Sequence, residues 1–173
     1  MKKINLLIIC FLLGYSAFGQ VPSTETFGAT VPKEAIKLDR DHVLSIAHKT
    51  LRQSYVPPGI ENTYQLDGLV ISYWGLSVSP DNTKSLEDSQ KEILGLLKRN
   101  EGDIVKNSKI VTVNNIRFLV YEYHRGDDVS LRFQSELDKN HKNVNGLIQF
   151  KKPDEDKAHK ALDDILHTIH FKD

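Results

Sequence analysis

Apolar residues recur at the spacing of a helix in three segments of the chain. The first segment covers residues 39–55, with Asp39 or Asp41 as its cap, and the second covers residues 85–100, with Ser85 as its cap. The third follows Pro153. Positions three or four apart lie on one side of a helix, so each segment is predicted to be a helix with one buried stripe. The stripes are Val43, Ile46, Ala47 and Leu51, then Leu86, Ile93, Leu94 and Leu97, and finally Ala158, Ala161, Leu162, Ile165, Leu166 and Ile169.

The remaining apolar residues alternate with polar ones, which is typical of strands with one buried face. An Asp67-Gly68 turn predicts a hairpin that pairs Leu66 with Leu69 and Tyr64 with Ile71. A two-residue turn at Asn114-Asn115 leads into a strand over residues 116–123, and a further strand covers residues 129–137. These segments predict an antiparallel β-meander flanked by helices, an α+β fold.

The requirement that apolar residues lie opposite one another predicts the register of the meander. A loop of odd length near Gly126 places Tyr121 opposite Leu131 and Leu119 opposite Phe133. A loop of two or six residues around Asn140 and His141 then places Leu137 opposite Val144 and Phe133 opposite Ile148. In this register Leu119, Tyr121 and Tyr123 face the core.

The N-terminus has the pattern of a secretory signal peptide. Lys2 and Lys3 precede a short apolar run, and Ala17-Phe18-Gly19 supplies small residues for cleavage. We therefore expect a signal peptide over residues 1–19, a flexible lead-in over residues 20–37 and one α+β domain over residues 38–173. The apolar run is too short to cross a bilayer, and the mature chain that remains after cleavage is expected to be periplasmic or secreted and to have no stable membrane span.

Cleavage changes what the composition excludes. The whole chain has 173 residues and balanced charges, whereas residues 20–173 carry 21 basic and 23 acidic side chains and neither Cys nor Met. Cysteine nucleophiles, disulfides and thiolate metal sites are thus excluded from the mature chain. The basic residues are interspersed with acidic ones, so no nucleic-acid partner is expected.

Residues 64–171 resemble a known family in their pattern of apolar positions. The pattern begins with the segment KIVTVNNIRFLVYEYHRGDD, in which the Asn114-Asn115 turn joins one strand to a second strand that carries Tyr121 and Tyr123. The strand GLIQF and a closing helix that ends in ILHTIHF follow. It resembles PsbP-like and DcrB-like domains, which are small α+β modules. The resemblance implies a PsbP-like fold and a mostly non-catalytic role in assembly or in binding partner proteins.

One face of the meander is a candidate partner surface. In the predicted register, the face opposite the core carries an apolar strip beside polar side chains, which we call the open sheet face. Either this face binds a protein or peptide partner, or one of the first two helices covers it. The candidate binding residues are Ile116, Phe118, Val120, Arg132, Gln134 and, as an aromatic anchor, Trp74.

A metal site is the other chemistry to consider. His159, Asp163 and His167 are spaced four apart on the last predicted helix, a geometry that can bind zinc. The neighbouring Lys157 and Lys160 oppose a dication there, so an ordinary solvated helix flank is the alternative. No nucleophile elbow or phosphate-binding loop is present in the sequence.

The sequence therefore predicts an exported, non-catalytic envelope protein, without a cofactor, that binds a partner through the open sheet face. Two alternatives stay open. One is a periplasmic immunity or inhibitor protein that binds a toxin through acidic loops such as Asp127-Asp128. The other is a metal-dependent enzyme that uses the flank of His159, Asp163 and His167.

Overall fold

A computed structural model describes residues 27–50 and 59–172 of the chain. The predicted signal peptide lies outside these residues. Strands and helices alternate irregularly along the chain, in the order β1 (Phe27–Gly28), β2 (Ile36–Lys37), α2 (Arg40–Thr50), η1 (Ile60–Asn62), β3 (Thr63–Leu66), β4 (Leu69–Ser77), η2 (Pro80–Asn82), α3 (Leu86–Arg99), β5 (Ile104–Val113), β6 (Ile116–Arg125), β7 (Asp128–Ser135), β8 (Lys142–Lys151), η3 (Lys152–Asp154), α4 (Glu155–Thr168) and β9 (His170–Phe171).

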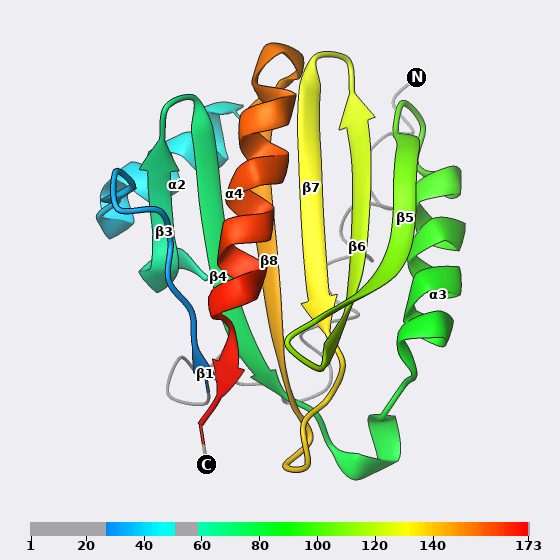
Figure 1. The fold of residues 1–173 in the computed structure, drawn as a ribbon. Helices are drawn as coiled ribbons and strands as arrows, with labels where there is room; N and C mark the ends of the chain where they lie inside the picture. The colour runs from blue at the N-terminus through cyan, green and yellow to red at the C-terminus, as the bar shows by residue number, and fades with distance from the viewer. Residues whose placement is uncertain (1–26, 51–58, 173) are drawn as a thin grey trace.

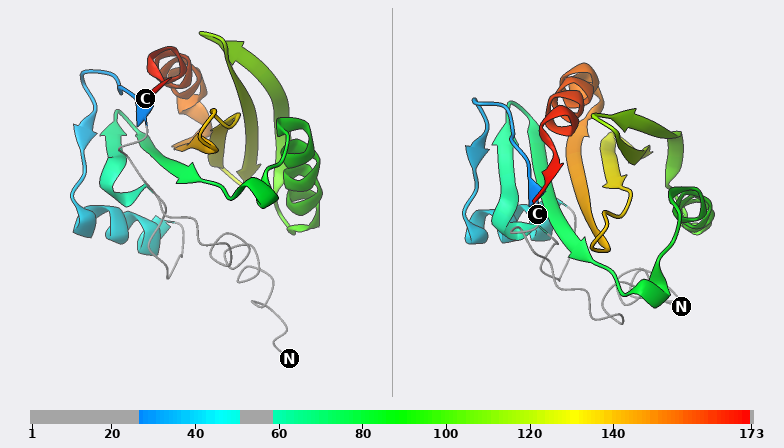
Figure 2. Two further views of the ribbon diagram at one scale, coloured as in Figure 1. Left: turned by 90° about the horizontal axis from the view of Figure 1, so that it is seen from below. Right: turned by 60° about the horizontal axis from the view of Figure 1, so that its bottom comes forward.

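Seven of the strands form one antiparallel sheet, in the order β2-β3-β4-β8-β7-β6-β5 (Figure 1). The consecutive strands β5 to β8 form the predicted meander, and β8 then pairs with β4. The sheet is curved, and β5 bends towards α4 (Figure 2). This architecture confirms the predicted α+β fold with an antiparallel meander.

The two faces of the sheet are covered by different helices. A row running from Ile71 through Ile148, Leu131 and Glu122 to Asn107 lies on what we call the α4 face. The buried stripe of α4 packs there with the main hydrophobic core. The opposite surface, the α3 face, carries α3 over β5 and β6.

Both predicted helix caps are formed. The Asp39 carboxylate accepts a hydrogen bond of 2.8 Å from the His42 backbone N–H at the start of α2, and the Ser85 hydroxyl accepts one of 3.0 Å from the Asp88 N–H at the start of α3. These bonds satisfy N–H groups that have no partner within the helix. The predicted first helix extended to residue 55, and residues 51–58 lie outside the described residues.

The predicted tight turns are confirmed. Leu66 pairs with Leu69 across Asp67-Gly68, as the sequence indicated. Asn114 and Asn115 have φ angles of 50° and 64°, in the left-handed region that Asn tolerates better than most residues. The Asn114-Asn115 turn joins β5 to β6, so that the end of β5 lies beside the start of β6.

The register predicted between β6 and β7 is wrong. The turn has two residues, Gly126-Asp127, so that Arg125 pairs with Asp128 and Tyr121 pairs with Arg132. Phe118, Val120 and Glu122 consequently share the α4 face with the buried residues of β7. The prediction failed because it avoided placing Tyr121 opposite Arg132, whereas the structure pairs these two residues and buries Glu122 on the α4 face with its own charge partners.

The register predicted between β7 and β8 is also wrong, by two residues. Phe133 pairs with Gly146, and Leu131 pairs with Ile148. A Cβ atom on Gly146 would lie 2.1 Å from the Phe133 ring, so this ring needs a glycine opposite it. A glycine inside a strand often marks such a close approach.

Residues 27–37, assigned from the sequence to a flexible lead-in, contribute two short strands. β1 pairs with β9 in a separate two-stranded sheet, in which Phe27 lies opposite Phe171. Phe27 is buried in the main core. The β2 strand forms one edge of the large sheet.

None of the helices within residues 27–50 and 59–172 is both long and apolar enough to cross a membrane.

Candidate functional site

A groove runs between α4 and the β5–β6 hairpin on the α4 face, and we call it the α4–β5 groove. It encloses a cavity of about 190 Å³. The floor is apolar and is formed by β5, β6, β7 and α4, whereas polar side chains gather near one end. The lining residues are Asn107, Lys109, Val111, Val113, Val120, Tyr121, Glu122, Leu131, His159, Leu162, Asp163 and Leu166.

The polar end is built around the buried carboxylate of Glu122, whose side chain is 3% exposed. His159 Nε2 lies 2.9 Å from Oε2 of Glu122, and Lys106 Nζ lies 3.5 Å from Oε1. Lys106 also pairs with Glu155 at the start of α4. When the Glu122 carboxylate is ionised it only accepts hydrogen bonds, and the imidazole is then the donor in this contact. This network joins β5, β6 and α4.

The network shifts the proton affinities of its two outer members. Hydrogen bonding to Lys106, together with its charge, lowers the pKa of the Glu155 carboxyl. The same hydrogen bond raises the pKa of the Lys106 ammonium, and the nearby Glu122 charge adds to this effect. Both shifts favour the charged forms, so the ion pair between α4 and β5 is present at neutral pH.

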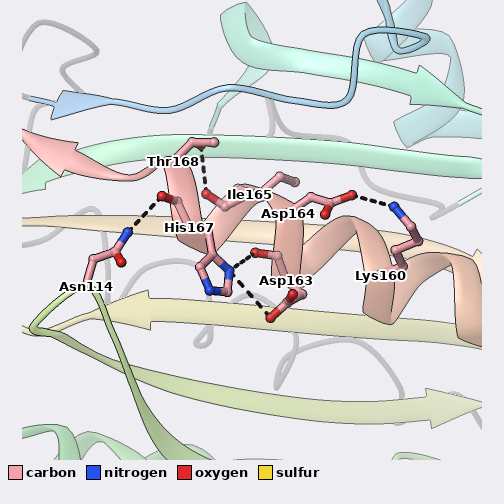
Figure 3. A network of polar contacts seen from close by, with 7 residues as sticks. All are labelled: Asn114, Lys160, Asp163, Asp164, Ile165, His167 and Thr168. Atoms are coloured by element: carbon pink, nitrogen blue, oxygen red, sulfur yellow. Dashed lines mark hydrogen bonds and ion pairs between the residues drawn. The ribbon is translucent and has the colours of Figure 1, made fainter.

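The other end of the groove is closed by a bond between the β5–β6 turn and the end of α4. The Asn114 side chain donates a hydrogen bond of 2.9 Å to the backbone carbonyl of His167 (Figure 3). Thr168 is the next residue, and its hydroxyl donates to the Ile165 carbonyl. The groove is therefore a hollow between two polar connections rather than an open face of the sheet.

The residues predicted as metal ligands do not converge. His159 points to Glu122, while the ring of His167 bonds the backbone carbonyl of Asp163 at 2.8 Å (Figure 3). The Asp163 carboxylate lies 3.6 Å from His167 and is largely exposed. Asp163 and His167 thus form a local pair on the outer flank of α4.

A different set of donors lies together at the polar end. One ligand atom from each of Glu122, Glu155 and His159 lies within 4.8 Å of the others. Two carboxylates and one imidazole are a donor set that suits zinc. The Lys106 ammonium already lies among these carboxylates as a cation, so a metal ion would have to displace it.

The residues predicted for the open sheet face are divided between the two faces. Phe118 and Val120 are 0% and 6% exposed in the core of the α4 face, and Ile116 packs against the same core. Phe118 is therefore not available to a partner, whereas Val120 lines the groove. The other three predicted residues, Trp74, Arg132 and Gln134, are half-buried on the α3 face.

Sequence reasoning missed the residues that define the ends of the groove, namely Lys106, Glu122, Glu155 and Asn114. The position of Glu122 could have indicated its role, because Glu122 alternates with Phe118 and Val120 and so lies on the same face of the strand as these two apolar residues. Acidic residues rarely lie there without a partner. His159, which directly follows Ala158 of the buried stripe on α4, was the natural candidate for that partner.

Comparisons with known proteins identify the fold. No protein-family model and no curated protein matches the sequence. Cyanobacterial PsbP (CyanoP) from Synechocystis sp. PCC 6803 is similar in structure, with a TM-score of 0.56 and 12% identity over 90% of this chain and 92% of that one. LpqN, described as involved in cell envelope biogenesis of Mycobacterium tuberculosis, has a TM-score of 0.55 and 11% identity over 95% of this chain and 97% of its own. The chain therefore has a PsbP-like fold, as its sequence pattern indicated.

Proposed function

We propose that this protein is an exported envelope protein that binds a protein or peptide partner in the α4–β5 groove and catalyses no reaction. The groove itself is the observation that carries this proposal. Its cavity of about 190 Å³ is smaller than the roughly 300–1,000 Å³ of typical small-molecule sites. It suits one or two apolar side chains of a larger partner.

The proposed location rests on two independent observations. The N-terminal sequence has the charged start, apolar run and small-residue exit of a signal peptide. The structurally similar LpqN is described as involved in cell envelope biogenesis, which supports an envelope role for a chain of the same fold. An envelope protein without Cys after cleavage has no disulfide to stabilise it, and the extensive core on the α4 face supplies stability by burial instead.

The arrangement around His159 supports binding rather than catalysis. The imidazole is directed at Glu122, and Lys106 supplies a further positive charge to the same carboxylate. The residues that line the cavity include no Ser, Thr or Cys beside His159 to act as a nucleophile. These contacts support a structural role for the polar end, in which the network joins α4 to β5 and fixes the spacing between them.

The immunity-type alternative depends on an acidic loop, and the local charges weaken it. Asp128 pairs with Lys151 at 2.6 Å, and Asp127 lies 3.9 Å from Lys152. The loop therefore presents little net negative charge to a basic toxin.

One observation favours the metal-dependent alternative, with a different ligand set from the one predicted. Glu122, Glu155 and His159 bring three suitable donors together beside a cavity. Titration of the purified protein with Zn²⁺, compared with a Lys106→Ala variant, tests this candidate. Stoichiometric binding that Lys106→Ala strengthens and His159→Ala abolishes would favour the metal over the binding-only proposal.

Photocrosslinking in living cells tests the proposed function. The photoreactive residue p-benzoylphenylalanine replaces Asn107, an exposed residue that lines the groove, or, as a control, Lys91, which is exposed on α3 and does not line the groove. We expect a discrete adduct from position 107 in the envelope fraction and none from position 91. Retention of the protein in the cytosol, or the absence of an adduct specific to position 107, would contradict the proposal.

A further inference from the structure

The strand that forms one wall of the groove is also an edge of the sheet. β5 has ten residues, from Ile104 to Val113, and pairs only with β6 within the described part of the chain. The backbone groups on its outer side bond to no described residue. The opposite edge of the sheet, β2, has only two residues. β5 is therefore the edge that can accept another strand.

The geometry of β5 places an added strand next to α4. Lys109, Val111 and Val113 project from alternate positions of β5 towards the groove. A strand hydrogen-bonded to the outer edge of β5 would lie about 4.8 Å from it. Its alternate side chains would then point to the same face and reach the apolar floor. A bulge at Lys106 interrupts the ladder, so the regular pairing surface runs from Asn107 to Val113.

The charges of β5 indicate which strand it would accept. Two lysines and no acidic residue lie between Ile104 and Val113. Lys106 is matched by Glu122 and Glu155, whereas Lys109 is exposed and forms no ion pair with any described residue. An acidic side chain on the incoming strand would therefore find its partner in Lys109.

We propose that the partner adds an extended segment to the outer edge of β5 as an eighth strand of the sheet, with an acidic side chain at Lys109 and an apolar side chain in the cavity beside α4. This inference rests on the proposed function and specifies the chemistry of its partner. Backbone hydrogen bonds supply the binding energy common to all such segments, and the two side chains select among them.

A library of short peptides displayed on phage provides the probe. Selection on the purified protein should enrich peptides in which an acidic residue lies two positions from an apolar one. The Lys109→Glu variant should lose these peptides, by tenfold or more in affinity, and select basic residues at the same position. The matched Lys33→Glu variant should select the same peptides as the wild type.

The backbone of a selected peptide tests the strand directly. A β-strand donates its N–H groups to a neighbouring strand at every second residue, so N-methylation should abolish binding at alternate positions only. Selected peptides that bind as helices, tolerate N-methylation throughout or ignore Lys109→Glu would overturn strand addition, and so would a selection without binders. The photocrosslinking result stands apart from these outcomes, because an adduct at position 107 supports a partner in the groove whatever its conformation.

Discussion

The pair formed by Glu122 and His159 is predicted to be coupled in energy as well as in geometry. Glu122 is 3% exposed, and its hydrogen bond to His159 is 2.9 Å long. A hydrogen bond to a charged group contributes about 1.5–3 kcal/mol. We therefore expect His159→Ala to lower the free energy of unfolding by about that amount, because it removes a partner from a buried carboxylate.

A double-mutant cycle separates this coupling from lost packing. Glu122→Leu replaces the carboxylate with an apolar side chain next to Val120 and Leu131. It should change stability little, because the partners that remain, Lys106 and His159, are half-exposed and can be hydrated. In that background His159→Ala should cost less than about 0.5 kcal/mol. Urea unfolding followed by circular dichroism measures all four proteins.

A control and a contrary result complete the experiment. His167→Ala removes an imidazole that lies 3.6 Å from an exposed carboxylate, so it should change stability by less than about 1 kcal/mol. If His159→Ala costs the same in the wild-type and Glu122→Leu backgrounds, the two residues are not coupled. The account of the polar end would then be wrong.

Three further predictions concern the core. Gly146→Ala should destabilise the protein by about 1–3 kcal/mol, because its Cβ would meet the Phe133 ring. As an exposed control, Gly95→Ala in α3 adds a Cβ that meets no neighbouring element within 4 Å and should stabilise the protein by about 0.5–1 kcal/mol. Urea unfolding measures both, and equal effects would contradict the packing. Phe118→Ala should cost about 3–5 kcal/mol in the same assay, and a cost below about 1 kcal/mol would restore Phe118 to a surface role. Burial raises the pKa of the Tyr73 phenol, so the folded protein keeps this proton at a pH where the unfolded chain has released it. The free energy of unfolding should therefore fall as the pH rises above about 10. If the free energy of unfolding of a Tyr73→Phe variant fell as steeply with pH, this cause would be refuted.

Local sequence signals predicted the elements of this fold well. Ser85 and Asp39 marked helix starts, and the Asp67-Gly68 and Asn114-Asn115 turns marked hairpins, because each depends on neighbouring residues alone. The buried stripe of α4 was likewise predicted in full, since its period reflects one continuous buried side.

The register of the meander could not be predicted in the same way, because it depends on contacts between distant residues. Alternation alone assigned Phe118 and Val120 to the outer face. The structure buries them because Glu122, in the same alternating series, is compensated by His159 from a helix 37 residues away. The α4–β5 groove arises from this register and from the bending of β5, so no local pattern indicated it.

Amide hydrogen exchange tests the central claim, that the partner binds in the α4–β5 groove, most directly. Exchange is measured by mass spectrometry on the protein alone and with the partner identified from the adduct at position 107. We predict slower exchange in β5, over residues 107–113, and no change in β2 at the opposite edge of the sheet or in α2 beside β3 (Figure 1). Protection confined to α2 or β2, with β5 unchanged, would contradict the account.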